Sequence, residues 1–84
     1  MIVVFSKRSC PNCVKAKALL KQYGVEWTER VIDEDDEARD FLIKQGHRAV
    51  PQMYVGDKYL GDYEDLTMMT EFEVEDKVEE LGKI

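Results

Sequence analysis

The residues best suited to chemistry are Cys10 and Cys13, the only two cysteines among the 84 residues. Pro11 and Asn12 separate them, and an apolar run at residues 2–5 precedes them. At this spacing both thiols fit on the first turn of a helix, where they can form a disulfide that opens and closes without unfolding the chain. A cysteine pair of this kind beside a strand–helix–strand pattern is typical of dithiol redox chemistry.

A structural disulfide and half of a zinc site are the two other uses of such a pair. A disulfide stabilises mainly by restricting the unfolded chain, and the effect grows with loop length, so this short bridge would add little. A closed zinc site needs more ligands than two thiols and the one imidazole of the chain, His47. Redox chemistry is therefore the favoured interpretation.

The length and composition indicate one small domain, residues 1–84. With 84 residues, of which 44% are hydrophobic, the chain has no room for a nicotinamide or flavin site as well. No apolar stretch approaches the length that spans a bilayer, and no secretory signal follows Met1. We therefore expect a protein of the reducing cytoplasm with no membrane partner.

Charge is distributed unevenly along the chain. All 18 acids follow Val25, so residues 1–25 carry a charge of +5 and the remainder −11, for a net charge of −6. Lys7 and Arg8 immediately precede Cys10, where a positive potential stabilises a thiolate and attracts anionic partners. Nucleic acid is not an expected partner, because the protein is acidic and its basic segment lacks interleaved aromatic residues.

The elements that position the cysteines follow from the sequence pattern. Residues 2–5 predict a short strand buried on both faces. Pro11 stands where a first helical residue tolerates proline, with Cys10 as the N-cap, and Gly24 ends this helix. The apolar stripe of the helix is Ala16, Leu19, Leu20 and Tyr23.

A second strand and a second helix follow. Residues 25–31 predict a strand with one apolar face, interrupted at Glu29, and place Trp27 in the core. Five acids at residues 33–37 predict the start of a helix, because the macrodipole favours negative charge there. Gly46 closes this helix, whose buried stripe is Ala38, Phe41 and Leu42.

The rest of the chain predicts a hairpin and a final helix. Gly56-Asp57 lies between the strand-like segments Met53-Tyr54-Val55 and Lys58-Tyr59-Leu60, and a two-residue turn that begins with glycine favours a type II′ hairpin. Residues 70–73 have the form of a capping box that starts a helix ending at Gly82-Lys83.

The predicted order is β-α-β-α-β-β-α, with one extra short helix around residues 66–69. The first strand–helix–strand unit implies a right-handed parallel crossover, whereas the hairpin strands are antiparallel. We therefore expect an α/β domain with a mixed sheet.

This ordered set of motifs resembles the glutaredoxins, a family with the thioredoxin fold, over essentially the whole chain. The resemblance implies a four-stranded mixed sheet flanked by helices, and an oxidoreductase with a redox-active disulfide that serves electron transport and cell redox homeostasis. The matching features are Lys7 three residues before Cys10, the Cys10-Pro11-Asn12-Cys13 site, Ala49-Val50-Pro51-Gln52 before the third strand, and Gly61 with Glu64-Asp65-Leu66.

The resemblance implies that the two cysteines act in different steps of disulfide reduction. Cys10 is expected to be the nucleophile, because the helix N-terminus and the neighbouring Lys7 and Arg8 stabilise its thiolate. Its attack on a substrate disulfide forms a mixed disulfide, and Cys13 then attacks Cys10 and releases the reduced product. Two glutathione molecules restore the dithiol, so glutathione is the expected co-substrate of a monomer that uses no metal or flavin.

The resemblance also implies a glutathione site beside the cysteines. The bond before Pro51 is expected to be cis, and the Val50 backbone is expected to pair with the cysteinyl part of glutathione like an added strand. Arg48 and Lys7 would meet the glycine carboxylate. The expected contact residues are Lys7, Asn12, Val50, Pro51, Gly61, Tyr63, Glu64 and Asp65.

The sequence departs from the family pattern at this site. Asn12 replaces the usual tyrosine and Ala49 the usual threonine, while Asp62 replaces the second glycine of a Gly-Gly pair and a bulky Tyr63 follows it. The helix start there normally receives the γ-glutamyl carboxylate of glutathione on backbone N–H groups. Asp62 would repel this carboxylate, point outward, or cap the helix itself.

Two further functions stay open. A glutaredoxin-like redoxin would accept electrons from thioredoxin reductase and pass them to ribonucleotide reductase, and Gly46-His47-Arg48 resembles such proteins equally well. Against it, the Cys10–Cys13 motif and Gln52 look more like the glutathione-dependent branch. An iron–sulfur carrier, using one cysteine and one glutathione from each of two subunits, is disfavoured by the second cysteine and by Pro11.

Overall fold

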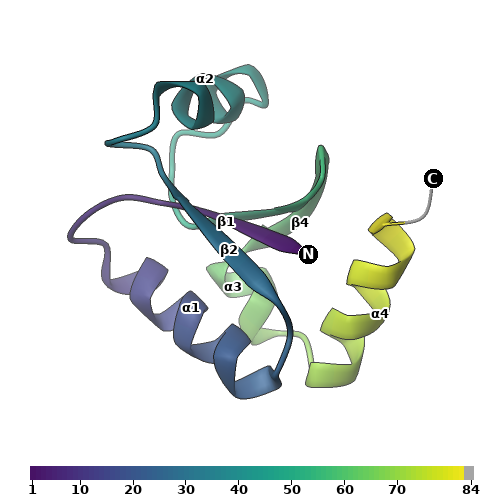
Figure 1. Ribbon diagram of the computed structural model, residues 1–84. Helices are drawn as coiled ribbons and strands as arrows, with labels where there is room; N and C mark the ends of the chain where they lie inside the picture. Colours follow the sequence, from purple (N-terminus) through teal and green to yellow (C-terminus); the bar gives the residue numbers. More distant parts are fainter. Residues whose placement is uncertain (83–84) are drawn as a thin grey trace.

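The computed structural model describes residues 1–82 and shows a four-stranded mixed sheet with helices on both faces (Figure 1). The sheet order is β2-β1-β3-β4, with β1 parallel to β2 and antiparallel to β3, and with β3 antiparallel to β4. The element bounds are β1 Ile2–Ser6, α1 Pro11–Tyr23, β2 Trp27–Val31, α2 Asp36–Lys44, β3 Gln52–Val55, β4 Lys58–Asp62, α3 Tyr63–Thr67 and α4 Glu71–Gly82. The thioredoxin-like fold and the order β-α-β-α-β-β-α are thus confirmed, with α3 as the extra helix.

Helix α1 begins and ends as the sequence predicts. Cys10 is the N-cap, Pro11 is the first helical residue, and Gly24 adopts the left-handed conformation with φ 71° at the C-terminus. The Gly24 N–H donates to the carbonyls of Leu20 and Lys21, which closes the last turn. Because β1 is a buried inner strand and α1 starts only a few residues after it, Cys10 is held just beyond the C-terminal end of β1.

The two faces of the sheet bury separate clusters. Helices α1, α3 and α4 cover one face and α2 covers the other (Figure 1). The larger cluster comprises Ile2, Val4, Ala16, Leu20, Met53, Val55, Leu60, Leu66 and Val74, and Trp27 packs partly buried against it. The cluster under α2 is Phe5, Ile32, Ala38, Leu42 and Tyr54. Buried apolar area on both faces of β1 and β3 stabilises the strands that carry the site.

Several boundaries differ from the sequence prediction by a few residues. Val25 lies before β2, where its N–H donates to the Leu20 carbonyl and completes the end of α1. Helix α2 begins only at Asp36, because the Asp35 side chain caps it by accepting from the Ala38 N–H at 3.1 Å. At the β3–β4 turn Gly56 has a φ of 64°, in keeping with the predicted hairpin.

Both helices at the C-terminal end start with capping boxes. The predicted box at Thr70 is present, since its hydroxyl accepts from the Glu73 N–H and its own N–H donates to the Glu73 carboxylate, each at 3.2 Å. Helix α4 runs to Gly82, and Lys83 lies outside the described residues. Among residues 1–82, no helix has the length and apolar character needed to span a membrane.

Candidate active site

Cys10 and Cys13 form a disulfide, with their Cα atoms 5.2 Å apart. The two cysteines differ in exposure: Cys10 is half-buried, whereas Cys13 lies one turn inside α1 and is 1% exposed. An incoming thiol or disulfide can therefore approach Cys10, while Cys13 is almost completely covered. This asymmetry suits a nucleophile and a resolving thiol.

The start of α1 supplies a hydrogen bond to the Cys10 sulfur. The Cys13 N–H donates to Cys10 Sγ at 3.2 Å, so the side chain of Cys10 acts as the N-cap. In the reduced protein the same N–H group and the positive end of the helix dipole face the Cys10 thiolate. Both favour the charged form of a thiol.

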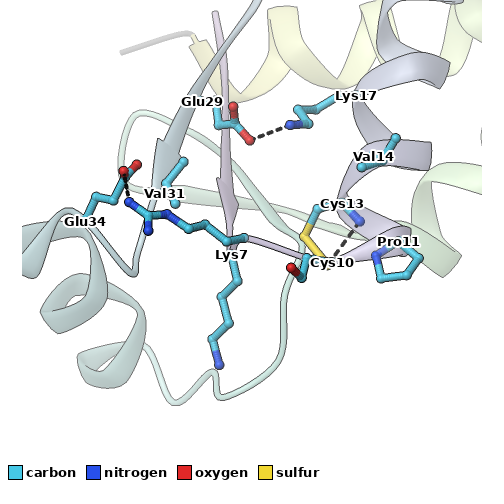
Figure 2. A pocket seen from close by; sticks show the side chains of 11 residues that line it. Lys7, Cys10, Pro11, Cys13, Val14, Lys17, Glu29, Val31 and Glu34 are labelled. Carbon is cyan, nitrogen blue, oxygen red and sulfur yellow. Dashed lines mark hydrogen bonds and ion pairs between the residues drawn. A yellow bond between two sulfur atoms is a disulfide. The ribbon is translucent and has the colours of Figure 1, made fainter.

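A cavity of about 590 Å³ opens on the α1–β2 side of the disulfide and is shown in Figure 2. Cys10 and Cys13 line one end of it, and a pair formed by Lys17 and Glu29 lies at the other. We call it the disulfide cavity.

The loop before β3 lies on the other side of Cys10. The Val50–Pro51 bond is cis, as the resemblance implies, and Cys10 Sγ lies 3.9 Å from the Val50 carbonyl oxygen. A groove of about 260 Å³ runs from this loop to the start of α3. The Pro51 groove, as we name it, is lined by Asn12, Ala49, Val50, Pro51, Gln52, Asp62, Tyr63 and Glu64.

A third hollow, of about 550 Å³, lies on the α2 side of the site and gathers positive charge. Lys7, Arg39 and Arg48 line it together with His47, and Asp33 is the one acid among its lining residues in the described chain. In Figure 2 the Lys7 side chain extends away from the disulfide. We call this hollow the basic cavity.

The glutaredoxin family model matches residues 2–60 of the chain. A probable glutaredoxin of Synechocystis sp. is 39% identical over 67 residues, which cover 77% of this chain and 76% of that protein. The chain belongs to the glutaredoxin family. Glutaredoxin 3 of Escherichia coli is 36% identical over 66 residues, covering 77% of this chain and 80% of that protein. The crystal structure of a buckwheat glutaredoxin–glutathione complex has a TM-score of 0.75 at 26% identity and covers 99% of this chain and 80% of that one.

Glutaredoxins are thiol–disulfide oxidoreductases, and this glutaredoxin has the cysteine pair that the activity requires. Of its predicted contact residues, the structure brings Asn12, Val50, Pro51, Tyr63 and Glu64 together in the Pro51 groove. Lys7 lies instead at the basic cavity and the disulfide cavity. Gly61 is buried in β4, and the Asp65 carboxylate is engaged in the cap of α3.

Asp62 caps α3 in this glutaredoxin. Its Oδ1 accepts from the Asp65 N–H at 2.9 Å, and its own N–H donates to Asp65 Oδ2 at 3.1 Å. Of the three roles that the sequence left open for Asp62, capping is the one that the structure shows.

Arg8, predicted to stabilise the thiolate, pairs with other groups. Its guanidinium forms an ion pair with Glu34, which raises the pKa of Arg8, and its backbone N–H donates to Asp33 Oδ2 at 3.0 Å. The Glu34 charge offsets that of Arg8, so the hydrogen bond from the Cys13 N–H is the more direct support for a Cys10 thiolate.

Two residues of the site carry no recognisable signal in the sequence. Arg39 is one of several exposed cations, and only the packing of α2 brings it beside Arg48. Tyr59 on β4 donates its hydroxyl to Gln52 Oε1 at 2.7 Å, and the Gln52 side-chain amide donates to the Ala49 carbonyl at 3.1 Å. Loss of solvent around the phenol raises the pKa of Tyr59 to about 12.

Glu29 is held in the disulfide cavity by two donors. Its Oε2 accepts from Lys17 Nζ and from the hydroxyl of the fully buried Ser6, each at 2.6 Å. Hydrogen bonds from Lys17 and then from Ser6 hold the pKa of Glu29 below its ordinary value. These contacts explain how a charged residue is accommodated at the centre of β2, where the sequence pattern showed an interruption.

Glu29→Gln should therefore destabilise the oxidised protein by about 1 kcal/mol at pH 7. A carboxylate whose folded pKa is depressed contributes stability above its unfolded pKa and loses it as the pH falls through the folded pKa. The difference from the wild type should accordingly disappear in strongly acidic solution. Urea unfolding at pH 7 and at pH 3 measures it, with the exposed Glu75→Gln on α4 as the matched control. The prediction would be contradicted if Glu29→Gln lowered the free energy of unfolding by the same amount at both pH values.

Proposed function

We propose that this protein reduces protein disulfides and glutathione mixed disulfides, with glutathione as its reductant. The observation that carries the proposal is the asymmetry of the cysteine pair, with Cys10 accessible and Cys13 at 1% exposure. The Cys10 thiolate attacks one sulfur of a substrate disulfide, that bond breaks, and the first substrate thiolate leaves. The Cys13 thiolate then attacks Cys10 Sγ, which releases the second substrate thiolate and forms the intramolecular disulfide.

Glutathione restores the dithiol in two exchanges. A glutathione thiolate attacks Cys10 Sγ, and the sulfur of Cys13 leaves as a thiolate. A second glutathione attacks the sulfur of the bound glutathione, which releases glutathione disulfide and the Cys10 thiolate. The two electrons that reduce the protein thus come from two glutathione molecules.

The cavities on the two sides of Val50 support a glutathione site. The Pro51 groove meets Cys10 at the Val50 carbonyl and ends at α3, where the γ-glutamyl part would lie. The basic cavity offers Lys7, Arg48 and Arg39 to the glycine carboxylate. The similarity to the buckwheat glutaredoxin–glutathione complex supports glutathione as a ligand of this protein.

A redoxin reduced by thioredoxin reductase, with ribonucleotide reductase as its acceptor, is the second candidate. Asp62 favours it, because a carboxylate lies where the γ-glutamyl carboxylate would approach. For both candidates we expect a monomer that works in the reducing cytoplasm.

Reduction of the oxidised protein by NADPH distinguishes the two candidates. One assay contains glutathione and glutathione reductase, and the other contains thioredoxin reductase alone. We expect fast turnover with glutathione and slow turnover with thioredoxin reductase. Turnover in the thioredoxin reductase assay, together with no turnover in the glutathione assay, would reject glutathione as the reductant and select the second candidate.

A further inference from the structure

The charges on the two sides of Cys10 have opposite signs. The Pro51 groove contains the carboxylates of Asp62 and Glu64, and no cation is among the residues of the described chain that line it. Among the described residues that line the basic cavity, Lys7, Arg39 and Arg48 outnumber the one acid, Asp33, although Arg39 also pairs with Asp36 at 3.7 Å. A ligand that crosses the Val50 backbone beside Cys10 therefore passes from a negative to a positive environment.

The Asp62 side chain is held in a fixed position in the Pro51 groove. It is half-buried, and the reciprocal hydrogen bonds with Asp65 hold both its backbone and its carboxylate. Because the Asp65 N–H at the start of α3 donates to Asp62, it is not free to bind an incoming carboxylate.

Glutathione matches only half of this charge pattern. Its glycine carboxylate suits the basic cavity, but its γ-glutamyl part carries both an α-ammonium and an α-carboxylate, so it brings no net positive charge to Asp62 and Glu64. A peptide in the same orientation places the residue before its cysteine beside these acids, and the residue after its cysteine beside the basic cavity. A cation before the cysteine and an acid after it satisfy both sides.

We propose that Asp62 determines the specificity of this site, and that the preferred substrates are disulfides of polypeptides with a lysine or arginine before the reactive cysteine and an acid after it. The inference rests on the proposed exchange at Cys10. It adds to that function the class of disulfide on which Cys10 acts fastest.

Two peptides of identical composition test the proposal: acetyl-Lys-Cys-Glu-amide and acetyl-Glu-Cys-Lys-amide, each as its mixed disulfide with thionitrobenzoate. In a single turnover of the reduced protein, Cys10 displaces thionitrobenzoate and joins the peptide sulfur. Cys13 then attacks Cys10 and releases the peptide thiolate, so the two electrons come from the protein dithiol. Absorbance of the released thionitrobenzoate gives the second-order rate constant of the first step.

The wild type should react roughly tenfold faster with the Lys-Cys-Glu peptide, a ratio typical of two favourable charge pairs replaced by two unfavourable ones near a surface. Asp62→Asn should reduce this ratio to about threefold. Asparagine caps a helix as well as aspartate does, so the fold of α3 is kept. Glu64→Gln, at an exposed position outside the cap, should reduce the ratio in the same direction. High salt should also reduce it, through screening.

Asp57→Asn in the β3–β4 turn is the matched control, because it removes one negative charge at an exposed position outside the groove. Equal rates for the two peptides, or a faster Glu-Cys-Lys peptide, would overturn the proposal. A preference that Asp62→Asn leaves unchanged would overturn the role of Asp62.

Hydroxyethyl disulfide, which carries no charge, separates this inference from the function on which it rests. Normal reaction with this compound but no peptide preference would reject only the specificity. Failure to react with it would reject the exchange at Cys10, and the inference with it.

Discussion

Cys10→Ser is expected to reduce thiol–disulfide exchange to the rate of the uncatalysed reaction with every substrate. A serine hydroxyl forms no disulfide, and it is not ionised at neutral pH, so neither the mixed disulfide nor its resolution can occur. Cys13 does not substitute for Cys10, because it is 1% exposed and lies one turn inside α1. The measurement is the rate of reduction of hydroxyethyl disulfide and of a protein disulfide, both coupled to NADPH oxidation.

Cys13→Ser is the matched variant, since it removes the other thiol of the same disulfide. The Cys10 sulfur keeps its place at the start of α1, and the backbone N–H of residue 13 still donates to it. Removal of glutathione from protein thiols should therefore persist in part, because glutathione itself can resolve the mixed disulfide, whereas reduction of protein disulfides should fail. A Cys10→Ser protein with full activity would disprove the assignment of the nucleophile.

The active-site half of the fold could be predicted from the sequence because its determinants are local. Pro11 and Gly24 mark the ends of α1, and the order of apolar runs gives the parallel crossover that brings the cysteines to the C-terminal end of β1. Gly56 at the hairpin turn and the capping box at Thr70 are equally local signals. The helix ends, the hairpin turn and the capping box each depend on residues within a few positions of one another.

The electrostatic environment of the site could not be predicted in the same way, because it depends on long-range packing. Arg8 meets Glu34, and Lys17 meets Glu29, across separations of 26 and 12 residues. Charged residues of this kind occur throughout the sequence, and nothing local distinguishes the ones that pair. For Asp62 the sequence left three roles open, and the hydrogen bond from the Asp65 N–H shows that it caps α3.

Gly61→Ala is expected to be the most destabilising substitution outside the core, at about 3 kcal/mol or more. Gly61 has a φ of 151°, which side chains of L-residues rarely adopt, and an added Cβ would lie 2.7 Å from the Asp65 Cβ and 2.9 Å from Asp65 Oδ2. Asp65 cannot move away without loss of its capping bond to the Asp62 N–H. Thermal unfolding should show a midpoint lower by roughly 12–24 °C, given the usual slope for a domain of this size.

Gly24→Ala is the control that separates backbone strain from steric contact. The difference in stability between Gly61→Ala and Gly24→Ala reports how tightly Gly61 of β4 packs against Asp65 of α3. Gly24 also has a positive φ, 71°, but an added Cβ would meet no atom within 4 Å, so a loss of only about 1 kcal/mol is expected. Adding Asp65→Ala to Gly61→Ala should restore little stability, because alanine keeps the Cβ that makes the shortest contact. If Gly61→Ala costs no more than Gly24→Ala, then Asp65 is free to move, and the cap that fixes the Asp62 carboxylate in the Pro51 groove is looser than the hydrogen bonds indicate.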